Sequence, residues 1–92
     1  MTDAANVLIE MSKTYKAKNS EYKDNYKVVG KIMGLLFPDG VPVELLSSDQ
    51  FHLFELKIVK LTRFARSNMK HLDSIHDDGV YSAMIEGILR DE

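Results

Sequence analysis

Two carboxylates stand one helical turn apart near the C-terminus. Asp73 and Asp77 begin a stripe that continues through Tyr81, Met84 and Ile88 at spacings of four, three and four residues. Because the later part of this stripe is apolar, we expect the whole stripe to face the interior of a helical protein. Two carboxylates so placed repel each other unless a positive charge lies between them. A hard cation such as Mg²⁺ suits the pair, because it binds carboxylate oxygens and bridges to phosphates. The stripe therefore predicts a metal site at Asp73 and Asp77.

The same two residues also have an ordinary structural interpretation. An acidic side chain in the first turn of a helix complements the helix dipole and accepts from free backbone N–H groups. This interpretation fits Asp73 as well as metal binding does, whereas Asp77 lies one turn further in, where capping does not explain it. His71 and His76 flank the pair, but a histidine next to an aspartate is common by accident, so the sequence favours the carboxylates as ligands.

Basic residues recur every three positions along another expected helix. This basic ridge consists of Lys57, Lys60, Arg63 and Arg66. Lys60 and Arg63 border apolar residues, and partly covered cations of this kind bind phosphate well. For Lys57 and Arg66 we favour a solvated flank with ion pairs to neighbouring residues. The net charge of −2 and the lack of stacking aromatic residues on the ridge argue against a nucleic-acid interface.

A third polar cluster lies between Glu21 and Tyr26. Glu21 and Asn25 are one turn apart on an expected helix, with Asp24 beside them. These side chains either complete a metal shell, contact the base or sugar of a nucleotide, or simply place acidic groups at the start of a helix.

The N-terminal half must position the third cluster, and its sequence pattern predicts a pair of helices. Its first apolar stripe runs from Ala4 to Tyr15, and Thr2 or Asp3 can cap its start. Ser20 can cap a second helix that runs to about residue 36. A segment with both prolines of the chain, 38–47, then separates the two halves.

The C-terminal half carries the basic ridge and the carboxylates on a second pair of helices. Ser47 and Gln50 have capping-box spacing at the start of a helix that runs from about 50 to 66. The last helix begins near 71–73 and ends near 88–89. No strand-like alternation occurs, so the sequence predicts an all-α bundle of about four main helices in one domain, 1–92.

Length and composition limit the expected assembly and location of the protein. A chain of 92 residues buries only roughly 60–65% of its unfolded surface, so we expect a homodimer or a higher homo-oligomer. It has no cysteine, no apolar run long enough to span a membrane and no signal-like N-terminus. We therefore expect a cytoplasmic protein that does not bind membranes.

Three segments together resemble a known family. They are Tyr22-x-Asp24-Asn25, Lys60-Leu-Thr-Arg63, and the run from Asp73 through Asp77 to Tyr81. In order and spacing they are similar to the phage-associated nucleotide modification associated domain 1 family. That family looks like a compact branch of the all-α nucleotide pyrophosphatases, which include MazG and the dimeric dUTPases. The resemblance covers about residues 20–90.

The resemblance implies a phage protein of the host cytoplasm that hydrolyses nucleoside triphosphates with Mg²⁺ or Mn²⁺. It implies metal ligands at Asp73 and Asp77, with Glu55 completing the catalytic carboxylates. It also implies ligand contacts, from Lys60 and Arg63 to phosphate and from Asp24 and Tyr81 as accessory groups.

The chain departs from the family pattern at two points. Lys23 stands where the family usually has glycine, and the doubled-glutamate motif Glu-x-x-Glu-Glu is absent. Two alternatives to an enzyme therefore stay open: a non-catalytic nucleotide binder or sponge, and a small phage protein that binds and modulates a host protein.

Overall fold

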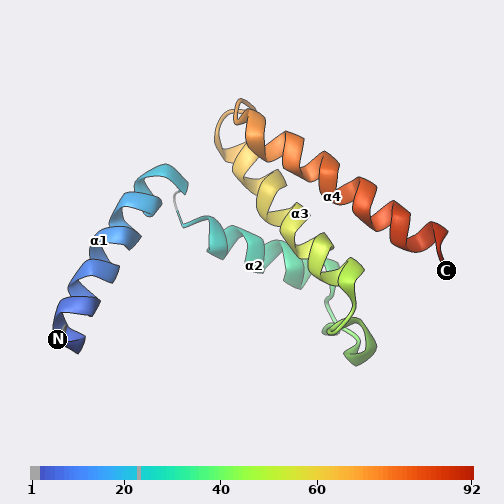
Figure 1. The fold of residues 1–92 in the computed structure, drawn as a ribbon, viewed down its shortest axis with the longest axis horizontal. Helices are drawn as coiled ribbons and strands as arrows, with labels where there is room; N and C mark the ends of the chain where they lie inside the picture. The colour runs from blue at the N-terminus through green and yellow to red at the C-terminus, as the bar shows by residue number, and fades with distance from the viewer. Residues whose placement is uncertain (1–2, 23) are drawn as a thin grey trace.

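Helices are the regular secondary structure of the described part of the chain. The computed structural model describes residues 3–22 and 24–92, with the backbone alone for 20–22. Within these ranges lie four α-helices, one short 3₁₀ helix and no strand, which confirms the expected all-α class (Figure 1). The elements are α1 (Ala4–Tyr22), α2 (Asn25–Leu36), η1 (Val43–Leu45), α3 (Asp49–Arg66) and α4 (Leu72–Arg90).

Helices α3 and α4 form an antiparallel hairpin (Figure 1). Helix α3 ends where Asn68 and Met69 adopt left-handed backbone conformations, with φ of 59° and 63°. The Met69 N–H donates to the carbonyl of Phe64 over 3.0 Å, which satisfies one free carbonyl of the helix end. The hydroxyl oxygen of Ser67 accepts from the His71 N–H at 2.9 Å. These bonds reverse the chain within a few residues, so α4 returns along α3.

Helix α2 packs on the other side of α3 and completes a small core. The Phe37 ring meets Phe51 and Phe54 edge to face, with centroids 5.8 and 6.3 Å apart. Among the described residues, the buried apolar side chains are Phe51, Leu53 and Ile58, all from α3. The core is therefore centred on α3, between α2 and α4.

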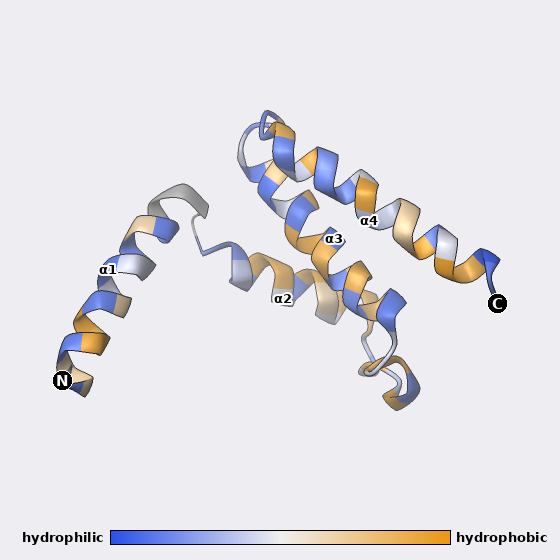
Figure 2. Ribbon diagram, in the orientation of Figure 1, coloured by the Kyte–Doolittle hydropathy of each residue, from blue (hydrophilic) through white to orange (hydrophobic). Residues whose placement is uncertain are grey.

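Most of helix α1 extends away from the other three (Figure 1). Its apolar side chains are exposed, with Leu8 65% and Met11 60% accessible, and Figure 2 shows hydrophobic stretches of the α1 ribbon with no other helix beside them. The radius of gyration is 16.5 Å, against about 12 Å for a compact chain of this length. The prediction that the first two helices form a pair like α3 and α4 is therefore wrong for the single chain.

Two predicted helix starts are displaced in the structure. Helix α1 continues through Tyr22, so the prediction of a new helix at Ser20 is wrong. The break comes at Asp24, whose left-handed conformation (φ 55°, ψ 41°) precedes α2. Aspartate tolerates this conformation better than most residues, and the Asn19 side-chain oxygen accepts from the Asp24 N–H at 2.6 Å. Lys23 lies outside the described residues.

At the other helix starts, the expected capping chemistry is present, with one shift. The Asp3 carboxylate accepts from the Asn6 N–H at 2.9 Å, as predicted, while Thr2 lies outside the described residues. Ser48, rather than Ser47, caps α3 by accepting from the Phe51 N–H at 3.2 Å. In the ranges that the structure describes, no helix is both long enough and apolar enough to cross a membrane.

Candidate functional site

The carboxylate stripe of α4 is turned by about one residue from the predicted position. Ser74 is completely buried and Asp77 is half-buried, whereas Asp73 and Met84 are exposed. The prediction that Asp73 faces the interior is therefore wrong, and that of Asp77 holds in part. The small Ser74 side chain lets the start of α4 approach α3, and its hydroxyl lies 2.5 Å from Nδ1 of His71.

Asp77 forms an ion pair with the basic ridge. Its Oδ2 lies 2.8 Å from Nζ of Lys60, whose side chain is 19% exposed against 38% for Asp77. The hydrogen bond from Lys60 holds the pKa of Asp77 below its ordinary value, with smaller help from the charges of Lys60, His76 and His71 and against a desolvation effect that raises it. Asp77 is thus ionised at neutral pH, and a lysine supplies the neighbouring positive charge.

A second ion pair runs parallel to the first. Lys57 Nζ lies 2.7 Å from Oδ1 of Asp78, and the two side chains are 18% and 15% exposed. Lys57 also donates to the hydroxyl of Ser82. The ion-pair interpretation of Lys57 is therefore confirmed, although the pair is more buried than a solvated flank would be.

The three predicted catalytic carboxylates are not gathered in one place. The pairs 60–77 and 57–78 set the register of the hairpin, which places Glu55 roughly 14 Å along the helix axis from the level of Asp73. Glu55 and Asp73 are both exposed. Among the described residues, no three His, Cys, Asp or Glu side chains are grouped to hold a metal ion. Two carboxylates, one of them bound to Lys60, do not fit a preformed Mg²⁺ site.

Tyr81 is half-buried on the face of α4 that carries Asp77. This position is part of the packing between α4 and α3, and Tyr81 does not line the cavity described next. The role of Tyr81 as an accessory ligand contact stays a prediction.

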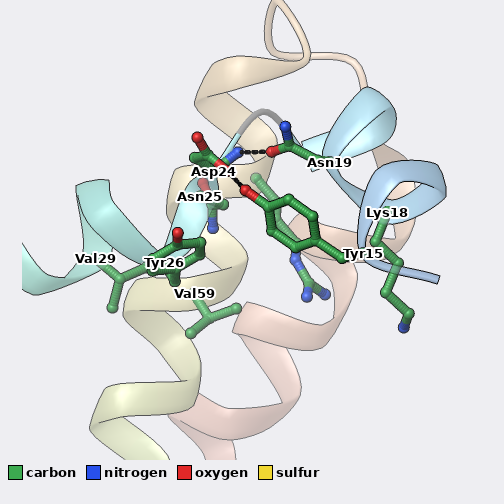
Figure 3. A pocket seen from close by; sticks show the side chains of 9 residues that line it. Tyr15, Lys18, Asn19, Asp24, Asn25, Tyr26, Val29 and Val59 are labelled. Carbon is green, nitrogen blue, oxygen red and sulfur yellow. Dashed lines mark hydrogen bonds between the residues drawn. The ribbon is translucent and has the colours of Figure 1, made fainter. Parts of the chain in front are cut away.

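A cavity of about 410 Å³ lies where α1, α2 and α3 meet (Figure 3). Its walls include Tyr15 and Asn19 from α1, Asp24 and Asn25 from the start of α2, and Val59 and Arg63 from α3. Asp24 and Arg63 belong to two of the three segments that carry the family resemblance. The cavity therefore brings together polar groups that are far apart in the sequence.

A hydrogen bond between helices closes one side of this cavity. The Tyr15 hydroxyl donates to Oδ1 of Asp24 over 2.8 Å, as drawn in Figure 3. This bond, followed by a hydrogen bond with Tyr26, raises the pKa of Tyr15 to about 12. The same bond lowers the pKa of Asp24, helped by the nearby charge of Lys27, whose Nζ lies 3.4 Å from the carboxylate. The pair joins the end of α1 to the start of α2.

Three polar wall residues from α1 escaped the sequence reasoning: Tyr15, Lys18 and Asn19. Tyr15 was expected only as the last member of an apolar stripe. The signal for Tyr15 was its hydroxyl at the end of that stripe, nine residues before Asp24.

Comparisons of the chain with protein-family models, with curated proteins and with solved structures give no match. The resemblance stated from the sequence therefore stays a prediction, and the arguments below rest on the residues themselves.

Proposed function

We propose that the protein binds nucleotides, with the nucleoside in the cavity and the phosphates along α3. The observation that carries this proposal is that Arg63 lines the same cavity as Asp24. A guanidinium at the cavity wall suits phosphate, and Lys60 lies about one turn before Arg63 on the same helix. The cavity is within the size range of small-ligand pockets, and two tyrosines and two valines line it.

The proposed activity is hydrolysis of a nucleoside triphosphate to a monophosphate and pyrophosphate. A water oxygen bonds to the α-phosphorus, the bridging bond to the β-phosphate breaks, and the protons of the water go to products and solvent. Mg²⁺ bound to the triphosphate would supply Lewis-acid chemistry, and Asp77 lies 2.8 Å from Lys60 of the basic ridge. This activity is supported by the order of the three segments in the sequence.

Binding without turnover is the second candidate, and a specific observation favours it. Asp77, a carboxylate that the resemblance assigns to catalysis, is held by Lys60 at 2.8 Å, while Glu55 lies at a different level of the hairpin. A nucleotide binder or sponge needs the cavity and the cations but no group of carboxylates.

Thermal unfolding with a nucleotide panel tests both candidates. A ligand that binds the folded state raises Tm, and the stabilisation grows with the logarithm of its concentration relative to Kd. Stabilisation by triphosphates with release of pyrophosphate supports hydrolysis, and stabilisation without release supports binding alone. If no nucleotide, with or without Mg²⁺, changes Tm, the proposal is wrong and the modulation of a host protein becomes the better hypothesis.

Self-association is part of the proposal. The chain exposes 7076 Å², which is roughly 1,600 Å² more than a compact monomer of 10.5 kDa exposes. Burying that excess on each of two chains gives an interface of the size found in obligate homodimers. A second copy that covers the apolar side of α1 accounts for the excess, since Leu8, Ile9 and Met11 are all more than half exposed.

A further inference from the structure

The apolar stripe of α1 has the spacing of a seam between two helices. Ala4, Leu8, Met11 and Tyr15 follow one another at intervals of four, three and four residues, and Lys18 continues the series three residues later. This alternation is that of the positions that face a partner helix in a coiled coil. In the single chain the stripe is open to solvent, with Leu8, Met11 and Tyr15 at least half exposed. The stripe therefore fits a second helix that lies along α1.

Within residues 3–22 and 24–92, no helix of the same chain lies along this stripe. Most of α1 extends away from the other helices, and only its C-terminal part reaches the cavity (Figure 1). The surface that each chain exposes beyond that of a compact monomer is of the size that a homodimer buries. A second copy is therefore the partner to consider. In a two-fold dimer the same surface of both copies meets, which places α1 against α1.

The charges along α1 favour one orientation of such a pair. Residues 3–10 carry the acidic Asp3 and Glu10, whereas residues 11–19 carry three lysines, Lys13, Lys16 and Lys18. Among the described residues, none of these side chains forms an ion pair. A parallel pair places three lysines beside three lysines, whereas an antiparallel pair places each basic part beside an acidic part. Because like charges in contact oppose association, the charges favour the antiparallel orientation.

The register of the pair follows from the stripe. When two stripes from Ala4 to Tyr15 overlap fully in opposite directions, Leu8 faces the partner's Met11 and Tyr15 faces the partner's Ala4. Tyr15 also lines the cavity, and so does Lys18 one turn later. The first turn of the partner's α1 then lies at the edge of the cavity, next to Tyr15.

We propose that two copies pair through α1 in antiparallel orientation, so that the first turn of each α1 forms one edge of the partner's cavity. This inference rests on the self-association proposed above and names its surface and its geometry. It also makes the cavity a shared site, because a molecule bound next to Tyr15 contacts both chains. Such a molecule stabilises the dimer, and the dimer in turn strengthens its binding.

Engineered disulfides test the orientation, because the chain has no cysteine of its own. Ala4→Cys and Tyr15→Cys chains are prepared separately, mixed in equal amounts to exchange subunits and oxidised, and the cross-linked species are identified by mass. The disulfide between the two different variants should exceed the two self-paired disulfides by about tenfold, a preference of about 1.4 kcal/mol. A predominance of self-paired disulfides indicates a parallel pair and overturns the inference.

A second pair of variants leaves Tyr15 unchanged. Val7 and Thr14 flank the stripe on one side and lie close to each other across the antiparallel pair, so Val7→Cys and Thr14→Cys should also cross-link mainly to each other. Asn6 and Lys13 are exposed on the opposite side of α1. The control mixture of Asn6→Cys and Lys13→Cys should therefore form little disulfide. Equal cross-linking in this control, or none in either test pair, contradicts the proposed surface.

Nucleotide binding is measured separately, so that the two proposals can fail independently. If the antiparallel disulfides form and no nucleotide changes Tm, the pairing stands and the nucleotide-binding function is wrong. If nucleotides bind and the self-paired disulfides predominate, nucleotide binding stands and this inference is wrong. A wild-type monomer in sedimentation contradicts both this inference and the self-association on which it rests.

Discussion

Lys60 Nζ lies 2.8 Å from Oδ2 of Asp77, and this ion pair joins the Lys-x-x-Arg segment of α3 to the Asp-x-x-x-Asp segment of α4. In the free protein, this lysine supplies a positive charge beside Asp77. Removing Asp77 therefore leaves a partly covered ammonium group without its partner, instead of relieving a repulsion between two acids.

Asp77→Asn should lower Tm at neutral pH and have little effect in strong acid. The folded-state pKa of Asp77 lies below its ordinary value of 3.8. Its stabilisation is therefore complete above about pH 4 and is lost as the pH falls through the folded-state pKa. Thermal unfolding between pH 7 and pH 2 measures this. Glu86→Gln, which removes an exposed pair with Arg90, is the control and should change little at any pH.

Mg²⁺ alone should not stabilise the protein, because Asp77 is already paired with Lys60 and Glu55 lies far from Asp73 along the hairpin. Thermal shift with millimolar MgCl₂ measures this, first without and then with a triphosphate, and Mg²⁺ should act only when the nucleotide is present. A shift by Mg²⁺ alone that disappears in both Asp73→Asn and Asp77→Asn would instead establish the metal site predicted from the sequence.

Tyr15 should titrate later than a free tyrosine. Its pKa is raised to about 12 by donation to Asp24, so the bond stabilises the fold below pH 10 and is lost as the pH rises from 10 to 12. The absorbance of tyrosinate, followed from pH 9 to 13, should show a late step that is missing in Tyr15→Phe. Asp24→Asn should move that step to lower pH. A titration curve that is the same in the wild type and Tyr15→Phe, apart from its amplitude, contradicts the bond.

Adjacent serines test the start of α3. Ser48→Ala removes the side chain that accepts from the Phe51 N–H, which should cost about 1 kcal/mol and lower Tm by roughly 4–8 °C. Ser47 is exposed and does not cap the helix, so Ser47→Ala should change Tm little. Urea unfolding gives the same comparison, and equal losses in the two variants would contradict the cap.

The four helices were predictable because their apolar spacing is a local property. The exact ends of the helices were not predictable. After Tyr22, for example, the Asp24 N–H donates to the side-chain oxygen of Asn19, and the spacing of apolar residues does not indicate such a bond. The partial burial of Lys60 and Arg63 was likewise predictable, because both border apolar residues of α3. The turn of α4 by one residue depended on Ser74, which is buried because it is small enough to let two helices approach. The cavity required the placement of α1, which is a tertiary property.

Charge on the apolar side of α1 should disrupt self-association. Met11→Glu replaces a side chain that is 60% exposed in the single chain, so the change should not disturb the fold of the monomer. It should weaken an interface that covers this position, because the carboxylate would be buried there. Sedimentation at micromolar concentration should show a dimer or larger species in the wild type and monomer in the variant. Asn6→Glu, an exposed position on the opposite side of α1, is the control. A wild-type monomer contradicts the proposal directly.

The small core has a thermodynamic consequence. Among the described residues only Phe51, Leu53 and Ile58 are buried apolar side chains, so unfolding one isolated chain uncovers little new apolar surface. Because the heat-capacity change and the denaturant slope of unfolding both scale with newly exposed surface, each should be small for a monomer of this length. Values typical of 92 residues would then come mostly from surface that dissociation exposes, and the unfolding midpoint would rise with protein concentration.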